Sequence, residues 1–232
     1  MSTIPSRIQN INDVIETINK QTLVPNRIFL NIPYEYKRFK NELIKESLLK
    51  EINQNNVEIT RCEDFGPGTK IMGSLNKVRN YDCVILLDDD HLYNEHVCEI
   101  FIEAFKEEQI NYSFYLNKIF SIKMGQCADG FLINTKLLDN IEKFYQHFVK
   151  DNLNMFMDDD LWLAIYLQKE KNSSIKNLID IFQKKINKKI VYEQNPNSKI
   201  DGLHMTVHKD GFILNRRKIQ KIEYIRYILK SC

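Results

Sequence analysis

Short apolar runs alternate with helix-periodic stripes through the first half of the chain, and this alternation constrains the fold more than any other feature. Apolar runs of strand length occupy residues 27–32, 57–60 and 82–87. Apolar residues at helical spacing occupy residues 8–18, 36–43, 71–78 and 97–105. Such an alternation is typical of a mostly parallel sheet that is covered by helices on both faces.

In the second half, strands follow one another more directly. The expected strands are residues 112–116, 119–123, 130–134 and 189–193. The expected helices are residues 137–148, 161–167 and 215–230. Closely spaced strands indicate a mixed sheet. The sequence therefore predicts an α/β fold with a central, mostly parallel mixed sheet flanked by helices, and its 232 residues fit a single domain.

Composition and charge argue against several functional classes. The net charge of +2 gives no strong field that favours nucleic acid or an anionic membrane. The sequence has neither a signal-peptide pattern nor an apolar run of about eighteen residues, so we expect no membrane span. The five cysteines have no paired or metal-binding spacing, which is typical of reduced thiols. We therefore expect a cytoplasmic protein without a nucleic-acid partner.

Three consecutive carboxylates, Asp88, Asp89 and Asp90, directly follow the apolar run 82–87. Like charges at this spacing repel one another unless a cation compensates them. Carboxylates suit Mg²⁺ or Mn²⁺, and substrate phosphates can complete the coordination shell. In an extended segment Asp88 and Asp90 point to the same side, so they are the candidate metal ligands, with Asp89 on the other side. An acidic turn or a helix N-cap is the alternative interpretation.

A second triplet, Asp158, Asp159 and Asp160, precedes the apolar stretch 161–167. Carboxylates at a helix N-terminus cap free N–H groups and interact favourably with the helix dipole. A carboxylate held there can also act as a general base that takes the proton from an acceptor hydroxyl. Both interpretations are open for this triplet. Trp162, within the apolar stretch, fits the core better than a sugar site.

Five stretches of the sequence together resemble GT-A glycosyltransferases. DCVILLDDDHLY, which contains the first triplet, resembles the DxD strand of that fold. STIPSRI, QTLVPNRIFLNIP and DFGPGTKIMGSL resemble a subset that includes small viral and microbial enzymes of the chlorella-virus type. DDDLWLAIYL resembles the acidic segment that precedes a tryptophan in the same subset. The resemblance covers roughly residues 1–167.

The resemblance implies a role for each matching residue. The nucleotide sugar would contact Thr3, Pro5, Arg7, Lys70, Asp88, Asp89, Asp129 and Gly130. Asp90, together with Asp88, would bind Mn²⁺ or Mg²⁺, and His208 is a further metal candidate because some GT-A enzymes use a late histidine. Asp159 and Asp160 would form the catalytic acidic pair, with Asp160 as the base. Residues 1–110 would be the nucleotide-binding half and residues 111–232 the acceptor-side half.

The function expected from this pattern is sugar transfer. A nucleotide sugar, with UDP as its expected nucleotide, would donate to a hydroxyl of a glycan or another acceptor, with inversion at the anomeric carbon. One alternative is a metal-dependent nucleotidyltransferase or phosphohydrolase, which would also use paired aspartates. The other is a binding module for nucleotide sugars without catalysis.

Overall fold

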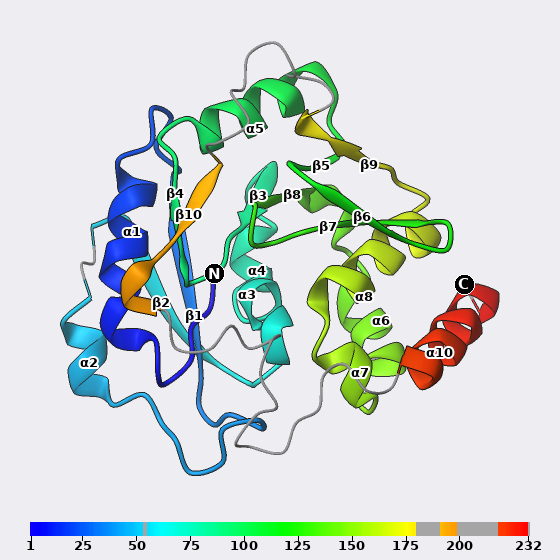
Figure 1. Cartoon of the computed structure of the whole chain (residues 1–232), viewed down its shortest axis with the longest axis horizontal. Helices are drawn as coiled ribbons and strands as arrows, with labels where there is room; N and C mark the ends of the chain where they lie inside the picture. The colour runs from blue at the N-terminus through cyan, green and yellow to red at the C-terminus, as the bar shows by residue number, and fades with distance from the viewer. Residues whose placement is uncertain (53–54, 180–190, 199–217, 232) are drawn as a thin grey trace.

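The computed structural model describes residues 1–52, 55–179, 191–198 and 218–231 as an α/β fold with mixed sheets (Figure 1). The strands are β1 (Ile28–Pro33), β2 (Val57–Cys62), β3 (Cys83–Leu86), β4 (His91–Tyr93), β5 (Asn111–Ser113), β6 (Leu116–Ile119), β7 (Ile122–Gly125), β8 (Phe131–Asn134), β9 (Ile175–Asn177) and β10 (Tyr192–Gln194). The α-helices are α1 (Ile11–Asn19), α2 (Glu46–Lys50), α3 (Thr69–Met72), α4 (Leu75–Val78), α5 (Val97–Glu107), α6 (Ile141–Phe148), α7 (Leu153–Phe156), α8 (Asp159–Ile165) and α10 (Lys218–Ser231). Short 3₁₀ helices span Ile8–Asn10, Gly66–Gly68, Thr135–Leu137 and Pro196–Ser198, and a π-helix spans Tyr166–Glu170. Within these ranges, no helix combines the length and the apolar character that crossing a membrane requires.

Two of the pairings between the described strands are parallel and four are antiparallel. β1 pairs in parallel with β2, and β5 pairs in parallel with β9. The antiparallel pairs are β3–β8, β5–β8, β6–β7 and β4–β10. The sheets are mixed, as predicted, but the expectation that they are mostly parallel is wrong for the described part of the chain.

The connections between strands explain this pattern. Parallel neighbours need a crossover, and the crossover contains α2 between β1 and β2 and α6 to α8 between β5 and β9. β8 instead follows the β6–β7 hairpin without an intervening helix, so it returns beside β5 in the opposite direction. The order β3–β8–β5–β9 places β8 between two strands and antiparallel to both.

Two hydrophobic cores lie on opposite faces of β8. Phe131 and Ile133 belong to the core that contains α6 and α8 residues, whereas Leu132 belongs to the core that contains α1, α5 and β1 residues. Successive strand residues point to opposite faces, so an apolar strand is buried throughout only where both faces are covered. The prediction of helices on both faces of the sheet is thus confirmed for β8.

Two local predictions are wrong. Residues 36–43 form no helix, because Asn41 adopts a left-handed backbone conformation with φ of +67°, which interrupts a right-handed helix. The next helix, α2, begins only at Glu46. No strand was predicted at residues 91–93, but they form β4 ahead of α5, because β10 pairs with them from far along the chain.

Close packing fixes the loop before α3. Gly66 has φ of +64°, and a Cβ atom at Gly68 would lie 2.7 Å from the Trp162 ring. Only glycine fits both requirements without strain. Trp162 is fully buried, which confirms its interpretation as a core residue. The packed loop holds Lys70, in the first turn of α3, close to residues after β3 and at the start of α8.

Candidate active site

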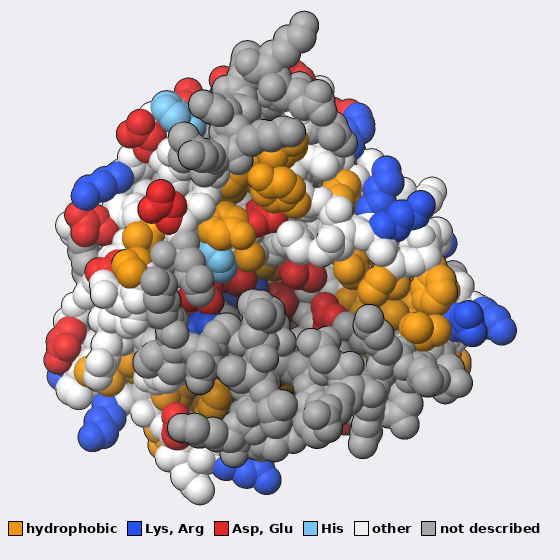
Figure 2. All heavy atoms as spheres, in the orientation of Figure 1, with side chains coloured by type: hydrophobic (Ala, Val, Ile, Leu, Met, Phe, Trp, Pro, Cys, Tyr) orange, Lys and Arg blue, Asp and Glu red, His pale blue; other side chains and the backbone are white. Residues whose placement is uncertain are grey.

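One cavity lies where the residues after β3, the start of α8 and the N-terminal segment meet, and its volume is about 270 Å³. Figure 2 shows acidic and basic side chains meeting in a hollow near the centre of this face. Of the residues predicted for the site, the cavity brings together Thr3, Arg7, Lys70, Asp88, Asp89, Asp90 and Asp159. The sequence therefore predicted most of the charged lining, although these residues come from four separate segments.

Part of the lining is apolar and aromatic. Pro33, Tyr36, Phe39 and Phe156 contribute to it. The Tyr36 hydroxyl donates a hydrogen bond to the Thr3 carbonyl at 2.9 Å, which ties the aromatic part to the N-terminal segment. A cavity with an aromatic part and a charged part suits a ligand that has a planar ring at one end and anionic groups at the other.

Asp89 holds the N-terminal segment. Its two oxygens accept hydrogen bonds from the Thr3 hydroxyl at 2.6 Å and from Arg7 Nη1 at 2.7 Å. Burial raises the pKa of Asp89, and the nearby Arg7 guanidinium counteracts part of that rise. Since both oxygens have protein partners, Asp89 positions Thr3 and Arg7 at the cavity wall. Its predicted contact with a nucleotide sugar stays a prediction.

Arg7 also reaches the next carboxylate, and its Nη2 lies 2.9 Å from Asp90 Oδ2. Burial alone would raise the pKa of Asp90, but the adjacent His91 ring and the Arg7 guanidinium outweigh it and lower that pKa. Asp90 is therefore a carboxylate at neutral pH.

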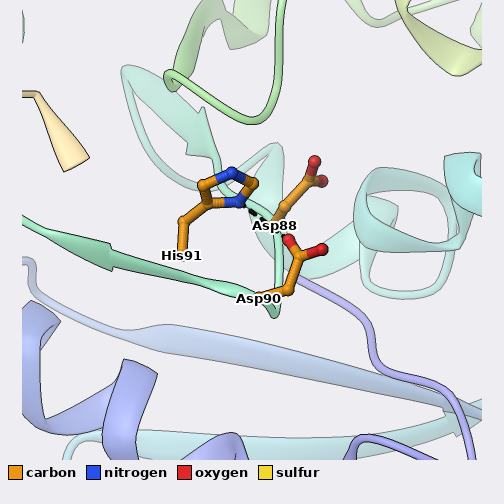
Figure 3. Close-up of side chains that lie close together, drawn as sticks. All are labelled: Asp88, Asp90 and His91. Carbon is orange, nitrogen blue, oxygen red and sulfur yellow. Dashed lines mark ion pairs between the residues drawn. The ribbon is translucent and has the colours of Figure 1, made fainter. Parts of the chain in front are cut away.

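Asp88, Asp90 and His91 form a cluster of metal-ligand type. Their side chains point toward one another (Figure 3), and one ligand atom from each lies within 4.8 Å of the others. Asp88 and Asp90 thus lie on the same side of this segment, as predicted. The reason differs from the predicted one, because the chain turns at Asp89 and Asp90 and does not continue as a strand. His91 was not predicted as a site residue, and its place directly after the triplet was the available signal.

Lys70 joins the two acidic triplets. Its Nζ lies 2.5 Å from Asp88 Oδ1 and 3.0 Å from Asp159 Oδ2, and its side chain is only 6% exposed. Burial would lower the pKa of Lys70, but Asp159 and Asp88 raise it well above the ordinary value. Lys70 is therefore charged, and it is the direct link between the end of the β3 segment and the start of α8.

The second triplet divides into a cap and an acidic pair. Asp158 is the N-cap of α8, and its carboxylate accepts a hydrogen bond from the Leu161 amide at 3.1 Å. Asp159 lines the cavity, whereas Asp160 is outside the lining and accepts a hydrogen bond from the Cys127 amide at 3.0 Å. Burial and the neighbouring Asp159 raise the pKa of Asp160 to about 8. The capping interpretation is thus confirmed for Asp158, and the general-base interpretation of the other two aspartates stays a prediction.

The remaining predicted residues lie elsewhere. Pro5, Asp129 and Gly130 are not in the cavity lining. Asp129 is buried and hydrogen-bonded to Tyr192, and burial raises its pKa to about 6. Gly130 has φ of +95° and packs against Phe101, so its role in the structure is conformational. His208 lies outside the described residues.

The charges around the cavity leave room for a divalent cation. Five carboxylates cluster there, namely Asp88, Asp89, Asp90, Asp159 and Asp160. Among the described residues, the fixed cations paired with them are Lys70 and Arg7, and the His91 ring also pairs with Asp90. These carboxyl groups outnumber the two fixed cations, and a divalent cation would offset the excess negative charge of the ionised ones. Together with the cluster around His91, this excess fits a bound metal ion.

Neither a family model nor a curated protein matches this chain. The chemistry of the site therefore has to be argued from its own residues.

Proposed function

We propose that this protein is a metal-dependent glycosyltransferase of the GT-A type. It transfers a sugar from a nucleotide-sugar donor, with UDP as the nucleotide, to a hydroxyl of an acceptor. The observation that carries the proposal is the junction at Lys70, where a cluster suited to a metal ion and an acidic pair meet beside one cavity.

The metal-type cluster and the acidic pair suit the two tasks of sugar transfer, which are stabilising the leaving group and deprotonating the acceptor. Asp88 and Asp90 would hold Mg²⁺ or Mn²⁺, and the metal, when bound, supplies charge neutralisation of the departing diphosphate. Arg7 and Lys70 add fixed positive charge at the same wall of the cavity. The aromatic part of the lining would receive the nucleoside.

The acidic pair would take the proton from the acceptor hydroxyl. Asp159 forms an ion pair with Lys70 at 3.0 Å. Asp160 has a pKa raised to about 8, and a general base works best when its pKa is near the working pH. We therefore assign the base to Asp160 and give Asp159 the task of keeping Lys70 in place.

Donor turnover tests this assignment. We expect the wild type to be stabilised thermally by UDP with Mn²⁺ and to release UDP from a UDP-sugar. Asp160→Asn should keep the stabilisation but lower turnover by about 100-fold or more, the usual contribution of a positioned base. Asp158→Asn is the matched control, because it preserves a capping side chain at the neighbouring position and should leave turnover close to wild type.

The products separate this proposal from its alternatives. A glycosyltransferase releases UDP. A phosphohydrolase cleaves within the diphosphate and releases UMP and sugar 1-phosphate, and a nucleotidyltransferase passes the uridylyl group to an acceptor and releases sugar 1-phosphate. A binding module shows the stabilisation without any turnover by the wild type. The proposal is wrong if sugar 1-phosphate is released in place of UDP, or if no nucleotide stabilises the protein in the presence of metal.

A further inference from the structure

The His91 side chain places one ring nitrogen beside the first acidic cluster. His91 Nδ1 is buried and has no hydrogen-bond partner among the described residues. It lies 2.7 Å from Asp90 Oδ1, yet the two groups do not have hydrogen-bond geometry. Leaving a buried polar atom unsatisfied is costly, so such an atom beside two carboxylates calls for an explanation.

The His91 ring is held in place by its surroundings. The Tyr192 ring packs edge-on against it, with centroids 4.2 Å apart and an interplanar angle of 90°. β10 supplies Tyr192, and it pairs with β4 in a register that sets Gln194 opposite His91. The orientation of Nδ1 toward the carboxylates in Figure 3 is therefore supported by packing.

The distances between the ligand atoms of the three side chains fit coordination of one metal ion. Adjacent ligands at metal–ligand distances of about 2.1 Å in an octahedron lie about 3 Å apart, and opposite ones about 4.2 Å apart. The separation of 2.7 Å between Nδ1 and Asp90 Oδ1 is close to the shorter value. All three ligand atoms lie within 4.8 Å of one another, so one ion could contact them together.

We propose that His91 is the third protein ligand of the metal site and that its imidazole makes the site prefer Mn²⁺ to Mg²⁺. Imidazole nitrogen is a better ligand for transition-metal ions than for Mg²⁺, which favours an all-oxygen shell. The inference rests on the metal site of the proposed function and adds a ligand and a metal preference to it.

Metal binding without nucleotide tests the proposal directly. Mn²⁺ affinity is measured by electron paramagnetic resonance, and Mg²⁺ affinity by competition with Mn²⁺. His91→Phe retains an aromatic ring against Tyr192 but removes the nitrogen. We expect this variant to lose about 10-fold or more in Mn²⁺ affinity and much less in Mg²⁺ affinity. Spin-echo spectra of Mn²⁺ on the wild type should contain an imidazole nitrogen coupling that the variant lacks.

Two further variants keep the test decisive. His96→Phe is the matched control, because His96 is about half exposed and pairs with Glu95 and Glu99 away from the cluster. It should bind both metals like the wild type. If His91→Phe fails to fold, His91→Gln replaces it and should lose the nitrogen coupling as well.

The outcomes distinguish this inference from the proposed function. If folded His91 variants bind Mn²⁺ as the wild type does, or if the wild type lacks the nitrogen coupling, His91 is not a ligand, and UDP release can still support the transferase. If the coupling is present but no nucleotide binds or turns over, the ligand assignment stands and the transferase proposal fails. If the wild type binds no Mn²⁺, the inference is overturned.

Discussion

The two acidic triplets have the same composition but different electrostatic surroundings. In the first, Asp89 and Asp90 both contact Arg7, and Asp88 contacts Lys70. In the second, Asp158 caps a helix, and the Lys70 ammonium contacts Asp159. The pKa of Asp90 in the first triplet is lowered, whereas the pKa of Asp160 in the second is raised to about 8.

This difference shows that the position of a carboxylate in the fold determines its chemistry. Residues after a strand turn toward the N-terminal segment, where a guanidinium can reach two of them. Of the residues at the start of the helix, one caps it, and the other two lie near each other, one buried and one partly exposed. One cluster is suited to hold a cation, and the other to hold a proton.

Removing Lys70 should have the largest effect, because it supports both triplets. Lys70→Met leaves Asp88 and Asp159 without their shared cation, and breaking a buried pair in this way costs about 3–5 kcal/mol. We expect the free energy of unfolding, measured by urea denaturation, to fall by about that amount. Mn²⁺ should restore part of it, because a divalent cation at Asp88 replaces one of the lost charge contacts.

An exposed lysine provides the matched control. Lys77 lies 2.6 Å from Glu58, and both side chains are more than 40% exposed. Lys77→Met should cost less than about 1 kcal/mol, the usual value for a surface ion pair. If Lys70→Met lowers the free energy of unfolding by no more than Lys77→Met does, the ion pairs of Lys70 with the two triplets contribute little to stability. The proposed link between the triplets is then wrong.

The sequence predicted the parts of this site that depend on local pattern. The buried run before Asp88 predicts a strand that ends in carboxylates, and the apolar stretch after Asp158 predicts a capped helix. Both are found. The contact between Lys70 and Asp159 could not be derived from spacing, because it depends on how a loop packed against Trp162 meets a distant helix.

Long-range pairing limited the fold prediction in the same way. The apolar run 130–134 identifies β8 as a buried strand, but a buried run carries no information on strand direction. β8 is antiparallel because a hairpin, and not a helix, precedes it. β4 was missed because its partner β10 is far away in sequence. Local periodicity therefore predicted most elements, whereas sheet order and direction required the connections.

The raised pKa of Asp160 allows the difference between the two triplets to be tested by varying the pH. A carboxyl whose pKa is about 8 when folded and about 4 when unfolded binds a proton more tightly in the folded state. Its stabilising effect is complete below about pH 4 and is lost as the pH rises toward 8. Because Asp160 is partly exposed, we expect Asp160→Asn to raise the free energy of unfolding at pH 8 by only about 1–2 kcal/mol. Urea denaturation from pH 5 to pH 8 measures this.

At pH 5 the same substitution should have little effect, since the wild-type carboxyl is then protonated in the folded state. The wild type should lose stability between these two pH values more steeply than the variant. Equal slopes for the two proteins would mean that Asp160 is ionised when folded, and that the second triplet differs from the first only in position.

The smallest effect should come from Asp158, the member of the second triplet that acts as a cap. Asp158→Ala removes the side-chain acceptor of the Leu161 amide at the start of α8, and losing such a cap costs about 1 kcal/mol. Asp158→Asn should retain most of this stability, because an amide oxygen can accept the same hydrogen bond. Urea denaturation of both variants measures the difference. If alanine and asparagine cost the same, charge near the helix dipole matters more than the hydrogen bond, and all three aspartates of the triplet then act chiefly through electrostatics.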